Sequence, residues 1–555
     1  MKWKLLLLPA AILGMLAEGC FSTPETDEPV PKPVPSKDYL DELITSLEKT
    51  APASSPELKN MKELRVALKD SPWAGHPIAC FSLDPFSPRA FLPAGELPPE
   101  RPDNSLLINA ARGETEPCSF AIYSFKDYSS VRIEAEDFRS KKKDRIPVSA
   151  MDIRIVTCRW KEQTAWNSPL ANPSSRILVP ELLLHDETLL KINPDKKENY
   201  LRIDYPSGPK YVWITYPREA DPGAFDPVRN PYSDADELQP FSLKEGLGKQ
   251  FWITVSVPED ARPGRYQSAL RIIADQTDIL GTLHLTLNVL PFTLPPPGTY
   301  RDPGKRFTVR CEAFLPDIPA SSGLQALQDP EAFAERLQIL KKRNITELPP
   351  LDDSSGKSLS SASDILKQEN RILKKQGFPP RQLRQPGDEQ ITEELCPRSI
   401  RNAHAIGDTI LLQVPFTGPV DPASMRRKLG MIPYKADADG IVLLLQRTDP
   451  GTEPGSRSSH PLNAFFYSPP EYPASGGATL ETLHAEALRE AVDDVRYATL
   501  LRLAAAEAMK QDRTRPLARE ALRLLAEFDE RKDHPDTLRQ RVIRYLLKLD
   551  AERKG

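Results

Sequence analysis

The segment that decides the fold lies near the middle of the chain, where two β-type runs meet at a proline-rich corner. It reads Lys249-Gln250-Phe251-Trp252-Ile253-Thr254-Val255-Ser256-Val257-Pro258-Glu259-Asp260-Ala261-Arg262-Pro263-Gly264-Arg265-Tyr266. Apolar and polar residues alternate over 251–257, which predicts a half-buried strand, and the same period resumes over 266–274. Pro263-Gly264 closes the corner, because proline fixes φ and glycine accepts conformations that are closed to other residues.

The same pattern extends outward on both sides of this segment. Alternating runs occur at 106–111, 118–125, 131–138, 151–160 and 280–290. Many short strands with proline-rich corners predict an antiparallel β-sandwich over 77–300, preceded by a helical lead-in over 38–76. The 57 prolines of the 555 residues fit sandwich edges and irregular loops, because proline cannot donate a hydrogen bond to a sheet or a helix.

Beyond residue 300 the pattern changes to alternating strands and helices. The runs 307–314, 409–414 and 440–445 read as strands, whereas 331–343 and 365–376 read as helices. This alternation predicts an α/β layer or barrel over 301–500, followed by C-terminal helices over 501–555. The stretch 301–477 is short for a (β/α)8 barrel, which usually takes about 250 residues. We therefore expect a multi-domain α+β protein with a shortened, incomplete TIM-like barrel.

Composition and spacing exclude several functional classes. The 74 basic and 78 acidic residues are mixed along the chain, so there is no electrostatic case for nucleic acid as a partner. The seven histidines are scattered, without the HxH or HExxH spacing of a metal site. There is also no GxSxG nucleophile elbow and no glycine-rich phosphate loop. We therefore expect neither a metal nor a cofactor.

The N-terminus predicts export. Lys2 and Lys4 precede a short apolar stretch over 5–16, which is too short to span a bilayer and fits a signal peptide over 1–19. The following Ala17-Glu18-Gly19-Cys20 resembles a bacterial lipoprotein processing site, so we expect a lipid on Cys20. Alternating prolines over 20–37 favour an extended spacer. The predicted location is the bacterial cell envelope, at the outer membrane or cell surface and in contact with the membrane through the lipid. Secretion after cleavage behind Gly19 is the alternative.

Four segments together resemble one family. The opening segment, Ala111-Arg112-Gly113-Glu114-Thr115-Glu116 and Leu287-Asn288-Val289-Leu290-Pro291-Phe292-Thr293-Leu294-Pro295 are similar to the sandwich that precedes the catalytic barrel of glycoside hydrolase family 123 and its relatives with the domain of unknown function 4091. Glu486-Ala487-Leu488-Arg489-Glu490-Ala491-Val492-Asp493-Asp494-Val495-Arg496-Tyr497 resembles the closing helix of those barrels. Taken alone, this last stretch also fits an ordinary amphipathic helix with Leu488, Val492 and Val495 inward.

The resemblance implies a specific chemistry. In the family, an adjacent Asp-Glu pair at the carboxyl end of a barrel strand performs substrate-assisted, retaining hydrolysis of N-acetylhexosaminides. The match here is Asp388-Glu389. Asp388 would orient the 2-acetamido group, whose oxygen attacks the anomeric carbon, and Glu389 would be the general acid and then the base. The same two residues also fit a helix start, with Asp388 as N-cap and Glu389 near the positive end of the helix dipole.

The distribution of aromatic residues bears on the predicted sugar site. Sugar sites use flat aromatic faces, yet all six tryptophans lie at or before Trp252, outside the predicted barrel. Tyr434 and Tyr467 are therefore the predicted substrate-binding residues, although each also fits core or loop packing. The sequence thus predicts a cell-envelope, glycoside-hydrolase-like lipoprotein related to N-acetylhexosaminidases. The alternative is a non-catalytic envelope lipoprotein that binds a glycan or a protein.

Overall fold

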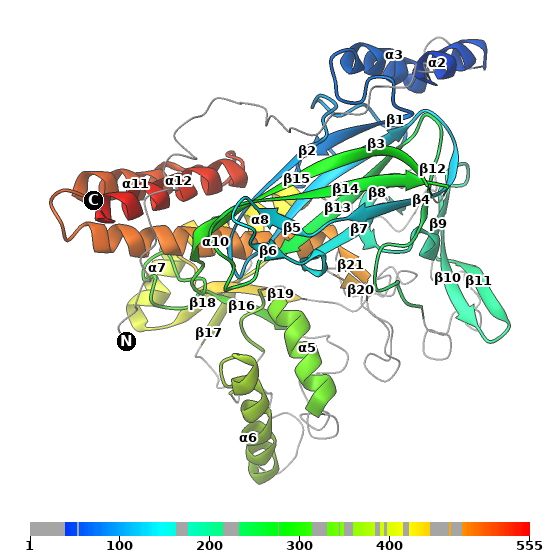
Figure 1. Ribbon diagram of the computed structural model, residues 1–555. Coiled ribbons are helices and arrows are strands. Elements are labelled where there is room, and N and C mark those ends of the chain that lie inside the picture. The colour runs from blue at the N-terminus through cyan, green and yellow to red at the C-terminus, as the bar shows by residue number, and fades with distance from the viewer. Residues whose placement is uncertain are drawn as a thin grey trace.

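The computed structural model describes residues 39–50, 52, 55–162, 176–214, 232–275, 277–312, 330–342, 344–348, 359–382, 389–392, 397–414, 421–444, 466–467 and 480–554. These residues form a mixed α+β structure of several sheets and helices (Figure 1). The predicted signal peptide, the spacer and Cys20 lie outside the described residues.

The helical lead-in consists of α2 (Tyr39–Thr50) and α3 (Pro56–Leu68). The side chain of Ser55 caps α3 by accepting from the backbone N–H of Leu58, and Pro56 occupies the first turn, where no N–H is needed. Both helices bury one apolar side in the core of the first two sheets. This agrees with the helices expected before residue 77.

Two large sheets follow, and each has seven strands in the described residues. The first is antiparallel, in the order β1 (Ile78–Leu83), β3 (Thr115–Ser124), β13 (Gly248–Ser256), β7 (Met151–Glu162), β8 (Arg176–Leu184), β21 (Leu480–Thr482) and β20 (Phe466–Tyr467). The second runs β12 (Phe241–Leu243), β4 (Tyr128–Ala135), β14 (Gly264–Ala274), β15 (Asp278–Thr293) and β2 (Ser105–Arg112), with β5 (Phe138–Ser140) and β6 (Arg145–Ile146) at the side.

The two sheets share one apolar core, to which strands β1, β3 and β13 contribute from one sheet and β2, β14 and β15 from the other. The proline-rich corner at 257–263 therefore carries the chain from the first sheet, at β13, to the second, at β14. A smaller sheet of β9 (Leu190–Asn193), β10 (Glu198–Tyr205) and β11 (Gly208–Trp213) extends beyond them (Figure 1).

The fourth sheet is parallel and has the order β16 (Thr308–Glu312), β19 (Gly440–Leu444), β18 (Thr409–Gln413) and β17 (Glu389–Thr392). A parallel bridge from Arg310 to Glu347 extends it on the other side of β16. Its helices are α5 (Pro330–Lys342), α6 (Leu359–Gln376), α7 (Pro397–Ile406), α8 (Pro422–Leu429) and α9 (Met431–Lys435). Strand–helix alternation is thus confirmed, while the incomplete barrel itself stays a prediction.

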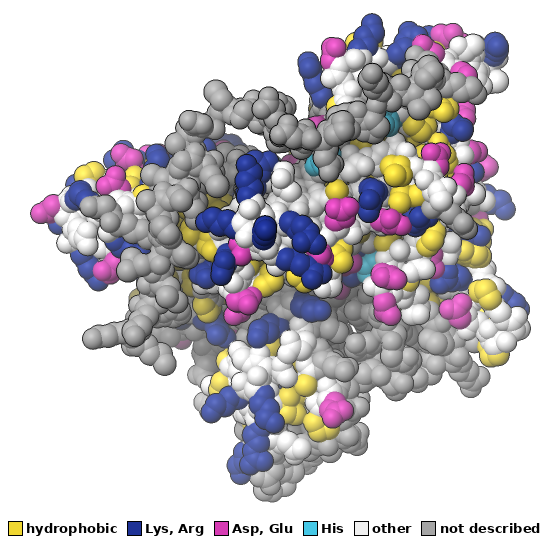
Figure 2. All heavy atoms as spheres, viewed as in Figure 1, with side chains coloured by type: hydrophobic (Ala, Val, Ile, Leu, Met, Phe, Trp, Pro, Cys, Tyr) yellow, Lys and Arg dark blue, Asp and Glu magenta, His cyan; other side chains and the backbone are white. Residues whose placement is uncertain are grey.

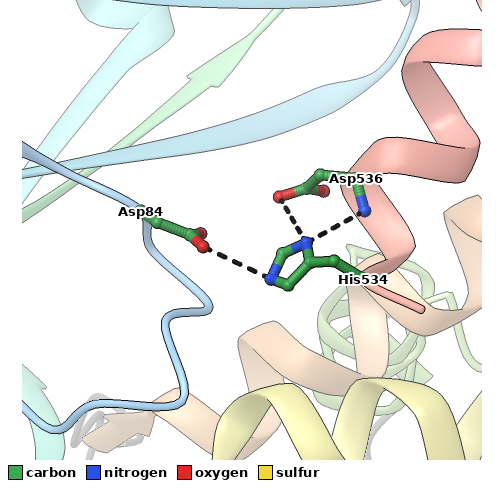
Figure 3. Close-up of side chains that lie close together, drawn as sticks. All are labelled: Asp84, His534 and Asp536. Atoms are coloured by element: carbon green, nitrogen blue, oxygen red, sulfur yellow. Dashed lines mark hydrogen bonds and ion pairs between the residues drawn. The ribbon is translucent and has the colours of Figure 1, made fainter. Parts of the chain in front are cut away.

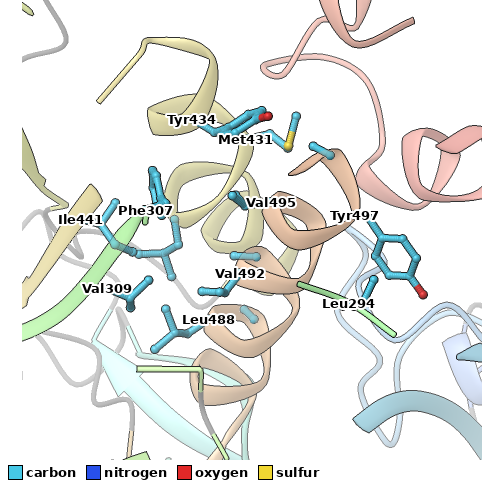
Figure 4. Close-up of a cluster of buried hydrophobic side chains, with 14 of the residues drawn as sticks. Leu294, Phe307, Val309, Met431, Tyr434, Ile441, Leu488, Val492, Val495 and Tyr497 are labelled. Atoms are coloured by element: carbon cyan, nitrogen blue, oxygen red, sulfur yellow. The ribbon is translucent and has the colours of Figure 1, made fainter. Parts of the chain in front are cut away.

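Helix α10 (Leu483–Ala508) lies at the centre of the second large core. Leu488, Val492 and Val495 pack with Phe307 and Ile441 of the parallel sheet (Figure 4). The same core contains residues from α11 (Arg515–Glu527) and α12 (Pro535–Lys554), as predicted for the C-terminal helices.

Helix α10 also contacts the first sheet, where the indole N–H of Trp252 on β13 donates to Glu486 at 3.0 Å. Strands β20 and β21 come just before α10 in the chain, yet they complete that sheet beside β8. Residues near 466–482 therefore complete a sheet whose other strands come from the first half of the chain.

Surface charge is mixed over most of the described face (Figure 2). Lys and Arg side chains gather where Figure 1 places β5 and β6, and the turn between these strands carries the exposed Lys141, Lys142 and Lys143. None of the described helices is long and apolar enough to cross a membrane.

The position of α10 generates a stability prediction. Leu488→Ala removes a side chain that is 1% exposed in the core, so we expect a loss of about 2–5 kcal/mol in the free energy of unfolding. Leu503→Ala, on the same helix but 43% exposed, should change stability by less than about 0.5 kcal/mol. Urea unfolding followed by circular dichroism measures both. Equal losses in the two variants would contradict a central position for α10.

Candidate functional site

One face of the parallel sheet carries a row of four side chains, three of them polar, which reaches the carboxyl end of β18 at Gln413. Arg310 of β16 and Gln413 of β18 are both in register with Val442 of β19, and Glu347 is bridged to Arg310 on the other side. Residues in register across a parallel sheet point to the same face. Val309 and Ile441 of the adjacent positions pack toward α10, so the row Glu347–Arg310–Val442–Gln413 faces away from that helix.

Arg310 and Glu347 form the charged half of this row. The guanidinium Nη2 of Arg310 lies 2.6 Å from Oε1 of Glu347, and Thr308 lies one step lower on the same face, with its hydroxyl 3.4 Å from Oε2. The Arg310 side chain is 3% exposed, whereas that of Glu347 is 29% exposed. Ligands of open parallel sheets bind at the carboxyl ends of the strands, so this row is our candidate site.

The predicted catalytic pair stays a prediction, because the structure describes only one of its two residues. Asp388 falls outside the described residues, and Glu389 is the first residue of β17, in register with Thr409 at the start of β18. The resemblance placed the pair at the carboxyl end of a strand, but the backbone of Glu389 lies at the amino end of β17. Glu389 belongs to a strand in the described residues, so it is not part of the helix start that was the alternative for this pair.

The predicted aromatic residues do not gather at the row. Tyr434 belongs to α9, is 0% exposed and packs edge-on against Tyr300 at 5.4 Å between ring centroids. It is a core residue here (Figure 4), in line with the packing alternative, and its ring is not open to a sugar. Tyr467 is in β20, where its backbone pairs with Leu480. Its proposed role stays a prediction.

A second constellation of charges surrounds α10 and is deeply buried. Arg539 of α12 donates through Nη1 to Glu116 at 2.9 Å and to Glu490 at 2.6 Å, and through Nε to Asp494 at 2.9 Å. Asp494 also accepts from Arg426 of α8, at 2.7 and 2.8 Å. Strand β3, α8, α10 and α12 are thereby joined through paired charges. This arrangement connects four elements of the structure. Among the described residues, it encloses no cavity that could hold a substrate.

Glu114 is a strongly perturbed carboxyl group beside this constellation. Its Oε2 accepts from the Tyr497 hydroxyl at 2.8 Å and from the backbone N–H of Ala111 at 2.6 Å. Burial, reinforced by the charge of Asp493, raises the pKa of Glu114 to about 7. Perturbed groups often mark functional sites, but Glu114 is fully enclosed, so we interpret its shift as a cost of the packing around α10.

Asp84, His534 and Asp536 bring three potential metal ligands within 4.8 Å of one another (Figure 3). The two carboxylates face different ring nitrogens: Asp84 lies 3.3 Å from Nε2, and Asp536 lies 3.8 Å from Nδ1. Asp536 also forms an ion pair with Arg426, at 2.7 Å. The hydrogen bond to Asp84 raises the pKa of His534. We interpret this group as an ion-paired joint between the segment after β1 and the start of α12.

Sequence reasoning missed Arg310 and Glu347. A signal existed, since an arginine inside an otherwise apolar strand run is rarely buried without a partner. The partner could not be found in this way, because only the parallel bridge brings Glu347, 37 residues away, beside it. The stretch 486–497 lies in α10, and its arginines bind other parts of the chain: Arg489 donates to the carbonyl of Thr115, and Arg496 donates to that of Pro295.

Comparisons with known proteins extend these observations. A family 123 glycoside hydrolase from Clostridium perfringens, studied for glycolipid glycan hydrolysis, is similar in structure, with 9% identity and a TM-score of 0.54 over 86% of this chain and 99% of that chain. At this identity the likeness concerns the fold alone. A PapD-like domain of human CEP192 also matches, with 8% identity over 34% of this chain and 81% of its own, but at a TM-score of 0.14 it carries no argument. Neither protein-family models nor curated proteins match the sequence.

The pKa of Glu114 generates a pH prediction. Because the folded state holds its proton up to about pH 7 while the unfolded state releases it near 4.5, the stabilising contribution is complete below about pH 4.5 and is lost as the pH rises through 7. Glutamine cannot ionise. The free energy of unfolding of Glu114→Gln should therefore rise relative to that of the native protein by about 1 kcal/mol or more between pH 5 and pH 8. Urea midpoints at both pH values measure this. A difference between variant and native protein that does not change with pH would refute it.

Proposed function

We propose that this chain is a glycan-binding relative of glycoside hydrolases at the bacterial cell envelope, with N-acetylhexosamine-containing glycans as its ligand class. The observation that carries the proposal is the likeness in fold to a family 123 enzyme across 86% of this chain and 99% of that one. A sandwich followed by a shortened barrel is the architecture that we assign to it on this basis.

The polar row supplies a place for the ligand. The row combines the half-buried carboxylate of Glu347, an acceptor held by Arg310, with the amide of Gln413, and such a mixture matches the donors and acceptors of sugar hydroxyl and acetamido groups. The row stands on strands whose other face is packed against α10, so its side chains start from a rigid base.

Binding without hydrolysis is the form of this function that the geometry favours. Substrate-assisted hydrolysis needs an acid and an acetamido-orienting carboxylate close to the same sugar. Glu389 begins β17 at the amino edge, whereas the row lies toward the carboxyl edge. Hydrolysis by Asp388 and Glu389 is the second candidate. It is suggested by the resemblance of these two residues to the catalytic pair of the family. A protein ligand in place of a glycan is the third.

A binding and turnover experiment separates these candidates. Purified protein is titrated calorimetrically with oligosaccharides of N-acetylglucosamine and N-acetylgalactosamine and is assayed on their nitrophenyl β-glycosides. We expect binding without nitrophenol release, and we expect Gln413→Leu to weaken binding at least tenfold because a donor and an acceptor are lost. Gln267→Leu, an exposed glutamine on β14, is the matched control and should bind like the native protein.

The catalytic alternative has its own variant. Release of nitrophenol that disappears in Glu389→Gln but persists in Glu331→Gln, an exposed glutamate of α5, would replace binding by hydrolysis as the function. Absence of both binding and release over both sugar series would contradict a glycan ligand and leave a protein partner as the better account.

The envelope location rests on Cys20 and is tested separately. If Cys20 is acylated, the full chain expressed in a bacterial host should fractionate with membranes and incorporate labelled palmitate, because a lipid adds membrane affinity that the described helices lack. Cys20→Ser should abolish the label and release the protein. Cys80→Ser is the control, since that buried thiol lies within the first sheet. Palmitate incorporation that survives Cys20→Ser would contradict the anchor.

A further inference from the structure

The amino edge of the parallel sheet contains a polar pocket that the proposed function does not use. It has a volume of about 180 Å³ and lies where the chain enters β16, β18 and β19. Its charged lining comes from three stretches that are distant in the sequence: Arg301, Asp302 and Lys305 from the first, His404 and Asp408 from the second, and Asp437 and Asp439 from the third. The polar row lies toward the other edge of the same sheet, so the pocket is a separate feature.

His404 is held in one orientation and keeps one nitrogen open. Its Nε2 lies 2.9 Å from Oδ2 of Asp439, and Asp439 is itself fixed by the backbone N–H of Ile410 at 2.9 Å and by Lys305 at 2.6 Å. Since a carboxylate accepts the Nε2 proton, Nδ1 of the neutral ring presents a lone pair. The His404 side chain is 8% exposed, and its buried Nδ1 has no hydrogen-bond partner.

Asp437 lies next to this nitrogen. Like His404, it has one polar atom that is bound by a neighbour and one that has no partner. Its Oδ2 is bound by Arg301 at 3.1 Å and lies 3.6 Å from Nδ1 of His404. Its Oδ1 is buried and has no hydrogen-bond partner. The two open atoms, Nδ1 and Oδ1, are both electron-pair donors. A buried pair of this kind calls for a cation or a hydrogen-bond donor between its members.

The chemistry of the surroundings favours a metal ion. A histidine that binds a metal almost always donates its other ring N–H to a carboxylate, as His404 does to Asp439. Zinc binds nitrogen and oxygen at about 2.0–2.2 Å, so two of its tetrahedral ligands stand roughly 3.4 Å apart. Nδ1 of His404 lies 3.6 Å from Oδ2 of Asp437, so the carboxylate that carries the open Oδ1 is close enough to share an ion with this nitrogen. Asp302 and Asp408 line the same pocket and give it an acidic excess over Arg301 and Lys305.

We propose that this pocket binds a divalent transition-metal ion such as Zn²⁺, with Nδ1 of His404 and the carboxylate of Asp437 as its protein ligands. Asp439 and Arg301 position these two ligands through their other atoms, and water completes the coordination. The ion ties the turn between α7 and β18 to the turn between α9 and β19. Sequence spacing did not reveal the site, because no short motif connects residues 404 and 437.

Calorimetric titration tests the site. Tag-free full-length protein is stripped with EDTA, dialysed and titrated with Zn²⁺. We expect one site in the native protein and at least tenfold weaker binding in His404→Gln, whose amide can still donate to Asp439 but lacks the second ring nitrogen. Asp437→Asn should weaken binding equally, and asparagine tolerates the positive φ of 65° at this position. Asp439→Asn should cost about 10–100-fold through orientation alone.

The matched control uses the other histidine with two aspartates. His534→Gln alters the joint at Asp84 and Asp536 and should leave zinc affinity unchanged. Melting curves of the metal-free proteins show whether each variant is folded, and zinc should raise the melting temperature of the native protein but not of Asp437→Asn. The proposal is overturned if the native protein binds no zinc, if His404→Gln and Asp437→Asn bind like the native protein, or if His534→Gln removes the site. Glycan binding is measured separately, so failure here leaves the proposed function intact.

Discussion

The burial of charged residues on α10 is the constraint on which the rest of the structure depends. Taking a carboxylate out of water costs several kcal/mol, and Glu490 and Asp494 are both nearly inaccessible. Each of them faces an arginine that offsets this cost: Arg539 from α12 pairs with Glu490, and Arg426 from α8 pairs with Asp494. Removing one partner of such a pair leaves the other charge buried without compensation. Helices α8, α10 and α12 can therefore reach their positions only together.

This constraint explains the order of the elements. Helix α10 must contact β3 through Glu116 and Arg539, and the parallel sheet through its apolar side, so it lies between the two. Gly430 allows α8 and α9 to approach it closely, because a side chain there would meet the backbone of Ala491. Strand β21, which leads directly into α10, is then placed at the edge of the first sheet, next to β8. A sheet made mostly of the first half of the chain is thus completed by its end.

Much of the fold could be predicted from the sequence because it depends on local periodicity. Strands such as β13 and β14 alternate cleanly, and α10 carries Leu488, Val492 and Val495 at helical spacing. The pattern could not distinguish a helix buried on one side from one buried all round, since the charged side of α10 looks like a solvated face until its arginine partners are known. Those partners lie far away in sequence, and periodicity contains no information about them.

The candidate sites were less predictable for a related physical reason. Which end of a parallel sheet a residue occupies depends on where its strand begins, and Glu389 is the first residue of β17, whereas Gln413 is the last residue of β18. A motif of adjacent carboxylates can therefore match a family in sequence order while the strand that carries it is shifted. The likeness in fold at 9% identity fits this view, because apolar packing tolerates many substitutions as long as volume and pattern are kept. Chemistry has no such tolerance, because a misplacement of about 1 Å from the productive geometry can cost about a hundredfold in rate.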